Sequence, residues 1–130
     1  LEGPRVVDYV RALEEVNLRM LAGFGIGAHR IDGLTGVWTD HGKLTAIGVH
    51  VTAGRVTQHG WATNVDPDLG DYAGIVPCGI DDRPVTSMRR LGATADMASV
   101  TTATIAAFED VFATTCRVAT IAGLHLDEVA

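Results

Sequence analysis

The residues best suited to chemistry are a cysteine, a lysine and a histidine, each in a different β-rich stretch of the chain. Cys78 lies in the sequence IVPCGI (75–80), where a short β-branched run gives way to a glycine. A thiol at such a strand end can act as a nucleophile when a neighbouring cation or base keeps it as the thiolate. Antiparallel strand pairing could bring Lys43 or His59 beside it. The alternative is a cysteine that only packs in the core.

Lys43 is the single lysine of the chain, which also carries nine arginines. Arginine serves wherever only positive charge is needed, whereas a lysine amine can also exchange its proton. One retained lysine therefore indicates either a position that needs a compact, titratable cation or a surface position where lysine occurs by chance.

Other polar residues give weaker signals. None of the five histidines and two cysteines falls at the spacing of a zinc site, so we expect no bound metal. The acidic group Asp66, Asp68 and Asp71 lacks the closing glutamate of a calcium loop and indicates a solvated turn. Asn64 stands in a predicted strand, where asparagine is disfavoured, which suggests a polar role. With His59 it could also serve a cysteine hydrolase, although no local signature accompanies the pair.

Periodicity predicts the elements that must position these residues. Apolar residues at helical spacing predict a helix from about Arg5 to Leu21, ended by Gly23 and followed by a connector. A short strand at 75–80 should end at its proline. Three more strands are expected to form an antiparallel meander, at residues 36–39, 43–51 and 56–65.

The rest of the chain predicts two further helices. A short helix is expected over residues 85–91. For the last, long helix, Thr94 is expected to be the N-cap, with Asp96 in the first turn. Cys116 falls on the same helical stripe as Phe112, which predicts a packed residue without chemistry.

Size and composition bound the class of protein. The 130 residues are enough for one domain with a core, and 47% of them are hydrophobic. The formal charge of −6 argues against a nucleic-acid partner, which would require a basic face. No apolar run is long enough to span a membrane and no signal-peptide pattern opens the chain, so we expect a cytoplasmic protein with free thiols. Because the first residue is Leu1, we expect the chain to be processed or part of something longer.

Four blocks of sequence resemble, in order, the signature blocks of the lipoyl(octanoyl) transferase family: KLTAIGV (43–49), HGWATNV (59–65), IVPCGI (75–80) and VTSM (85–88). The predicted helix and the GVW strand are also similar to elements of that family. This resemblance implies an α/β, α+β-like domain, with a mixed sheet and flanking helices as in biotin and lipoate protein ligases. The family's upstream glycine-rich, histidine-containing block has no match here. Residues 1–130 are therefore expected to be a single domain, the C-terminal part of such a catalytic domain.

The resemblance implies a role for each quoted residue. The cysteine of the PCGI block carries the acyl group as a thioester in that family, and here it is Cys78. The lysine of the KxxAIG block favours the thiolate and assists proton transfer, and here it is Lys43. The residues expected to line the acyl pocket are Ala46, Ile47, Gly48, Gly60, Trp61 and Ala62. The polar neighbours expected at the site are His59, Asn64 and Thr86.

The implied reaction moves an octanoyl group from octanoyl-acyl carrier protein, through the Cys78 thioester, to a lysine of a lipoyl carrier domain in lipoate biosynthesis. The implied acceptors are the lipoyl domains of 2-oxo acid dehydrogenases and the glycine cleavage carrier protein. No cofactor, ATP or metal is required, because a thioester is already activated. An ATP-dependent lipoate–protein ligase is the first alternative, although it would need no thiol in the PCGI block. A truncated domain that binds carrier proteins without turnover is the second.

Recognition of these partners requires local positive charge, because both partners tend to be acidic and so is this chain. The expected basic patch consists of Arg83, Arg89 and Arg90. Three residues depart from the family pattern: His50 stands where the family commonly has an arginine, Trp61 replaces a smaller side chain, and Thr63 replaces an apolar one. A pocket of different size is the expected consequence.

Overall fold

Two helices and four strands make up the part of the chain that the computed structural model describes, residues 5–70 and 83–120. In chain order they are α1 (Val6–Gly23), β1 (His29–Ile31), β2 (Leu34–Thr39), β3 (Gly42–Val51), β4 (Thr57–Thr63) and α2 (Met97–Phe112). The strand expected at 75–80, and with it Cys78, lies outside the described residues.

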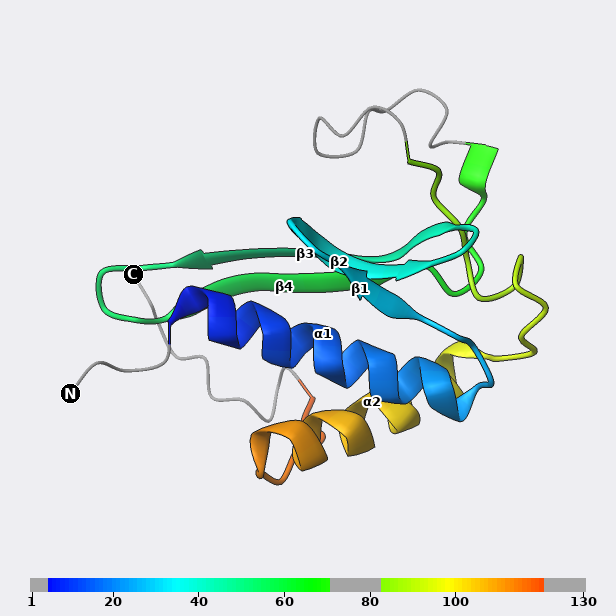
Figure 1. Cartoon of the computed structure of the whole chain (residues 1–130). Helices are drawn as coiled ribbons and strands as arrows, with labels where there is room; N and C mark the ends of the chain where they lie inside the picture. The colour runs from blue at the N-terminus through cyan, green and yellow to red at the C-terminus, as the bar shows by residue number, and fades with distance from the viewer. Residues whose placement is uncertain (1–4, 71–82, 121–130) are drawn as a thin grey trace.

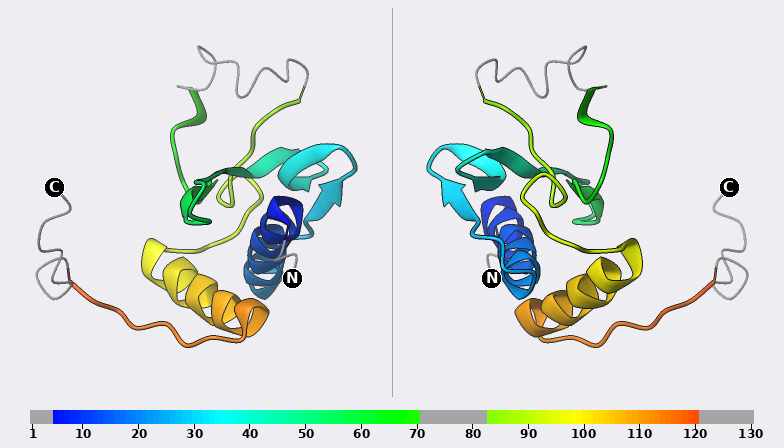
Figure 2. Two further views of the ribbon diagram at one scale, coloured as in Figure 1. Left: turned by 90° about the vertical axis from the view of Figure 1, so that its left-hand side faces the viewer. Right: turned by 90° about the vertical axis from the view of Figure 1, so that its right-hand side faces the viewer.

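The four strands form one sheet in the order β1-β2-β3-β4, and each strand is antiparallel to its neighbours. Both helices lie on the same face of this sheet (Figures 1 and 2). The expected α/β, α+β-like class with flanking helices is therefore confirmed, as is the antiparallel meander. In the described ranges, parallel pairing is limited to a single bridge between Lys43 and Val85.

The core fills the space between the helices and the sheet. The helix α1 buries an apolar stripe that includes Val16 and Met20, while Val37 and Leu44 face this stripe from the strands. Such burial supplies most of the folding energy of a small domain. Neither α1 nor α2, the two helices of the described chain, is both long and apolar enough to cross a membrane.

Two stretches differ from the sequence prediction at the sheet. The expected connector after α1 contains β1, a strand of only three residues, which is too short to show an alternating pattern. The helix predicted over 85–91 is wrong. The backbone N–H groups of Thr86 and Met88 donate instead to Lys43 O (3.0 Å) and Asn64 O (2.9 Å), so this segment runs beside the sheet as far as Met88. Residues 88–92 then form a hydrogen-bonded turn that ends at Gly92 (φ +82°).

The ends of α2 also differ from the prediction. Its N-cap is Asp96, whose side chain accepts the Ser99 N–H at 2.7 Å, so the assignment of Thr94 as N-cap is wrong. The helix ends at Phe112, because Ala113 adopts a left-handed conformation (φ +48°) that usually requires glycine. Cys116 therefore does not lie on the helical stripe, and its half-buried side chain follows the helix by one turn.

Asp96 is expected to make the stability of α2 depend on pH. The hydrogen bonds from the Ser99 backbone N–H and hydroxyl lower the pKa of Asp96. A carboxylate with a lowered folded-state pKa adds stability above its unfolded pKa, about 3.9, and loses it as the pH falls through the folded pKa. The thermal unfolding midpoint should drop as the pH falls below about 4, and Asp96→Asn, which caps without titrating, should drop less. Equal acid dependence of the two proteins, followed by circular dichroism, would exclude this cap as a contributor.

Candidate active site

Lys43 lies where β3 meets the segment that follows residues 71–82. Its backbone N–H donates to Pro84 O (2.8 Å), and its carbonyl accepts the Thr86 N–H (3.0 Å). These two bonds make the parallel bridge with Val85. The fold thus joins the KLTAIGV and VTSM blocks, which are about forty residues apart in the sequence.

The Lys43 side chain rests on an aromatic ring. Its Nζ atom lies 4.9 Å from the centroid of the Trp38 ring, and the guanidinium carbon of Arg83 lies 5.7 Å from the same centroid. A bulge between Val37 and Trp38 shifts the β2–β3 register so that Trp38 pairs with Lys43. The face of a tryptophan attracts cations, most strongly where water is scarce, and Trp38 is only 2% exposed. Trp38 therefore holds two cations beside the site.

Two glycines make this packing possible. At Gly42 (φ +126°) a Cβ atom would lie 2.3 Å from Pro84 O, so only glycine lets the Pro84–Thr86 segment approach β3. At Gly36 (φ +116°) a Cβ atom would lie 2.6 Å from Thr45 O and 2.8 Å from Lys43 Cε. Both positions also have backbone angles that other residues rarely adopt.

Replacing Gly42 with alanine is expected to lower the free energy of unfolding by at least about 1–3 kcal/mol, because strain at positive φ adds to the clash with Pro84. Urea unfolding measures the change. Gly27→Ala is the matched control, since nothing lies within 4 Å of its Cβ position and its φ is not in the strained range. Equal losses in the two variants would contradict the close approach at Pro84.

The residues expected to line an acyl pocket lie side by side across β3 and β4. The register pairs Ala46 with Ala62, Ile47 with Trp61, and Gly48 with Gly60. Strand alternation puts these pairs on two faces of the sheet. Ala46, Gly48 and Ala62 are exposed on the face away from the helices, where their small side chains leave the surface open.

Trp61 belongs to the opposite face. Its ring stacks on Phe108 of α2 with the centroids 6.5 Å apart, and it packs against the core. Its partner Ile47 is half-buried. Of the six predicted pocket residues, these two therefore support the sheet from the helix side.

Two of the three predicted polar neighbours lie beside the Lys43 bridge. Asn64 donates from Nδ2 to Thr86 O (3.1 Å), and its N–H donates to Leu44 O (3.0 Å), so it ties the Thr86 segment to β3. Thr86 is buried. The structure does not bring His59 to Lys43, because His59 pairs with Val49, six residues or about 20 Å further along β3.

The expected basic patch is partly neutralised. Arg89 forms an ion pair with Asp66, both at the surface. Arg90 and Thr86 are among the residues that line a hollow of about 540 Å³ beside the bridge. Among the described residues, no group of three His, Cys, Asp or Glu side chains could hold a metal ion.

Two buried polar residues of α1, Glu14 and Asn17, were missed by the sequence analysis. Both are 0% exposed and interrupt the apolar stripe of the helix, which is the signal that could have identified them. Asn17 donates from Nδ2 to Leu13 O (2.9 Å) and accepts the Thr63 hydroxyl at Oδ1 (2.8 Å). Thr63 in turn is 2.9 Å from the Thr45 hydroxyl, so a polar chain joins α1 to β4 and β3. Thr63, one of the residues that differ from the family pattern, therefore faces α1.

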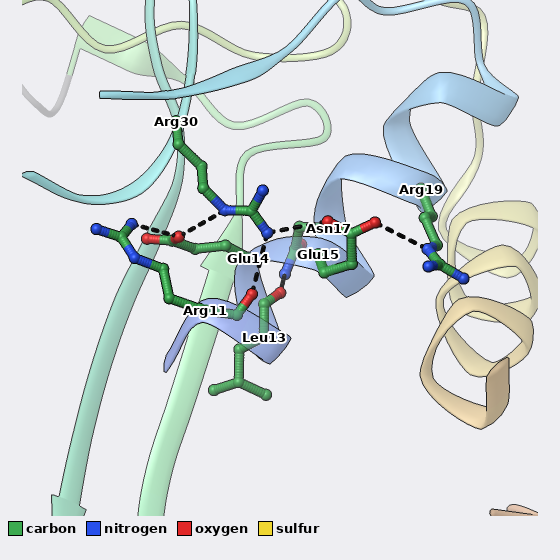
Figure 3. Close-up of polar contacts among 7 residues, drawn as sticks. All are labelled: Arg11, Leu13, Glu14, Glu15, Asn17, Arg19 and Arg30. Atoms are coloured by element: carbon green, nitrogen blue, oxygen red, sulfur yellow. Dashed lines mark hydrogen bonds and ion pairs between the residues drawn. The ribbon is translucent and has the colours of Figure 1, made fainter. Parts of the chain in front are cut away.

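Glu14 connects α1 to β1 and β2, and Figure 3 shows its contacts with Arg11 and Arg30. Its Oε2 atom accepts hydrogen bonds from Arg11 Nη1 (2.7 Å) and Arg30 Nε (3.0 Å). Its Oε1 atom accepts the backbone N–H of Gly36 (3.1 Å). Every bond that this buried carboxylate accepts comes from a different segment, so it fixes their relative positions.

The family model and the curated proteins that match this chain agree with one another. A family model described as "Lipoyl protein ligase A/B catalytic domain" matches residues 2–109. Among curated proteins, the octanoyltransferase of Chloroflexus aurantiacus is 50% identical over 123 residues, which cover 92% of this chain and 55% of that protein. The octanoyltransferase of Chloroflexus aggregans is 51% identical over 113 residues (85% and 51%), and that of Rhodospirillum rubrum is 44% identical over 115 residues (85% and 53%). The chain thus spans about half the length of these relatives.

Proposed function

The chain belongs to the lipoyl protein ligase A/B catalytic domain family, and from this premise we propose that it is the part of an octanoyltransferase that carries the reacting cysteine and lysine. The observation that carries the proposal is the position of Lys43, the single lysine, on Trp38 and against the segment 84–86. Cys78 precedes this segment by a few residues, a chain length that allows its thiol to reach the amine.

The proposed reaction has two acyl transfers. The Cys78 thiolate attacks the carbonyl carbon of the octanoyl thioester on the acyl carrier protein, and the carrier thiolate leaves with a proton supplied from Lys43. The lysine amine of a lipoyl domain then attacks the new Cys78 thioester. Its proton passes to Lys43, an amide forms, and the Cys78 thiolate is released.

The open face of β3 and β4 is the proposed wall for the octanoyl chain. Alanine and glycine pairs at Ala46–Ala62 and Gly48–Gly60 leave room for an alkyl chain beside the backbone, and no polar side chain projects from these four positions. Trp61 acts from the helix side, where it stacks on Phe108, and its cross-strand partner Ile47 lies on the same face. His59 is proposed as a neighbour of the far end of the wall, while Asn64 and Thr86 hold the Lys43 end.

The proposed donor is octanoyl-acyl carrier protein. The proposed acceptors are the lipoyl domains of 2-oxo acid dehydrogenases and the glycine cleavage carrier protein. The cytoplasm is the proposed location, because thiols are kept reduced there and disulfides are rare.

The donor requirement tests the proposal. The chain, alone and joined to the upstream part of the Chloroflexus aurantiacus relative, is incubated with a lipoyl domain and either octanoyl-acyl carrier protein without ATP or octanoate with ATP. Octanoylation of the lipoyl domain from the carrier protein without ATP is the expected result, read by mass. A strict need for ATP would identify a ligase instead. No transfer by either folded protein from either donor would leave only a binding function.

Replacing Arg89 and Arg90 together with alanine is expected to raise the KM for the donor carrier protein several-fold and to flatten its salt dependence. The reason is that both side chains are exposed close after the reacting segment and attract an acidic partner. Arg117→Ala, also exposed, is the control and should leave the KM unchanged. Steady-state rates at low and high salt measure the effect, and an unchanged KM in the double variant would remove the patch from the docking surface.

A further inference from the structure

We propose that Glu14 is a positioning residue for Lys43 and that it acts through the backbone of Gly36. The proposal rests on the catalytic role proposed for Lys43. Two successive contacts support it. Glu14 Oε1 accepts a hydrogen bond from the Gly36 N–H (3.1 Å), and Gly36 in turn lies against the Lys43 side chain.

Gly36 is in direct contact with the lysine stem. A Cβ atom built on Gly36 would lie 2.8 Å from Lys43 Cε and 3.5 Å from Lys43 Nζ, so the stem occupies the space that any other residue would fill. The Trp38 ring supports the same side chain, with its centroid 4.9 Å from Nζ. Lys43 therefore lies between two residues of β2, and the position of β2 sets the position of its amine.

Glu14 is well suited to fix the position of β2. The side chain is 0% exposed, and a buried carboxylate is costly unless its oxygens are paired. Arg11 and Arg30 neutralise Oε2, and both keep partly exposed side chains (41% and 35%), which leaves Oε1 to hold the backbone of Gly36. Because buried ion pairs often add little net stability, the arrangement favours a role in placing the strand.

The single lysine permits a direct test on the full chain. Protein labelled with ¹³C-lysine gives one Hε–Cε signal, which the Trp38 ring current should move away from its random-coil position. Three variants are compared with the wild type. Glu14→Gln keeps an oxygen acceptor for Gly36, and Glu14→Asp keeps the charge but is one methylene too short. Glu15→Gln, the control, removes ion pairs with Arg19 and with Arg30 of β1 and leaves the Glu14–Gly36 hydrogen bond in place.

The proposal predicts that the Lys43 signal stays shifted in Glu14→Gln and Glu15→Gln and loses its shift in Glu14→Asp, while the Trp61 indole N–H signal reports an intact fold in all three. An unchanged Lys43 signal in folded Glu14→Asp would overturn it. If Glu14→Asp does not fold, the wild-type protein provides the test through the nuclear Overhauser effect between Gly36 Hα and Lys43 Hε. Observing this effect would support the proposal, and its absence would overturn the proposal.

Activity provides a second readout. In Glu14→Asp the single-turnover rate of Cys78 acylation should fall by about 10–100-fold at unchanged half-saturating donor concentration, and Glu14→Gln should restore most of it. A chain that never forms the acyl-enzyme would contradict the proposed function and leave the lysine signal as the separate test of Glu14.

Discussion

Replacing Cys78 with serine is expected to abolish the octanoyl-enzyme and, with it, transfer to the lipoyl domain. The thiolate is the nucleophile in such a reaction, and a serine hydroxyl remains protonated at neutral pH without a stronger base. The wild-type chain incubated with octanoyl-acyl carrier protein should gain a single octanoyl group that hydroxylamine removes, as expected of a thioester. Intact-protein mass spectrometry measures the adduct.

Cys116 provides the matched control for this experiment. It is the only other cysteine, its side chain is half-buried, and its backbone N–H is bound to Glu109 Oε1 at 2.7 Å after the end of α2. Cys116→Ser should acquire the adduct like the wild type. An adduct that persists in Cys78→Ser, or that disappears in Cys116→Ser, would contradict the assignment of the nucleophile.

Replacing Lys43 with alanine is expected to slow acylation by about 10²–10⁴-fold, the usual contribution of a positioned proton-transfer group. The variant also leaves Trp38 without one of its two cations and removes a charge that stabilises the thiolate. Rapid-quench measurement of the adduct gives the rate of the first step, and addition of the lipoyl domain to the preformed adduct gives the second.

Lys43→Arg separates charge from proton transfer. A guanidinium can remain on the Trp38 ring as Arg83 does, but it does not release its proton at accessible pH. In Lys43→Arg we expect iodoacetamide to alkylate the Cys78 thiol at a rate close to that of the wild type. Acyl transfer by this variant should remain slow. Wild-type transfer rates in both variants would exclude Lys43 from the reaction.

Local sequence pattern predicted the elements whose contacts are local. The stripe containing Val16 and Met20 predicts α1, and alternation predicts β3 and β4, because neighbouring strands joined by short turns pair with each other. The resemblance of four blocks assigns site residues to β3 and β4, which stays a prediction, and the register places two of these residues, Ala46 and Ala62, opposite each other.

Features that depend on distant contacts could not be predicted. The segment 85–91 has a helical composition, yet Lys43 and Asn64 accept its backbone N–H groups, and neither acceptor is near it in the sequence. Trp38 reaches Lys43 through a bulge that no residue type announces. The role of Glu14 likewise requires knowing that Gly36 lies 3.1 Å from it across the helix–sheet interface.

The Lys43–Val85 bridge also bears on the order of folding. The meander from β1 to β4 forms through short loop closures, which cost little entropy and favour rapid pairing, whereas the bridge closes a loop of about forty residues. The strands should therefore assemble before the segment 84–86 reaches Lys43. Lys43 would then meet the segment 84–86 only in the last stage of folding. A chain arrested before that stage would have a native meander and no assembled site.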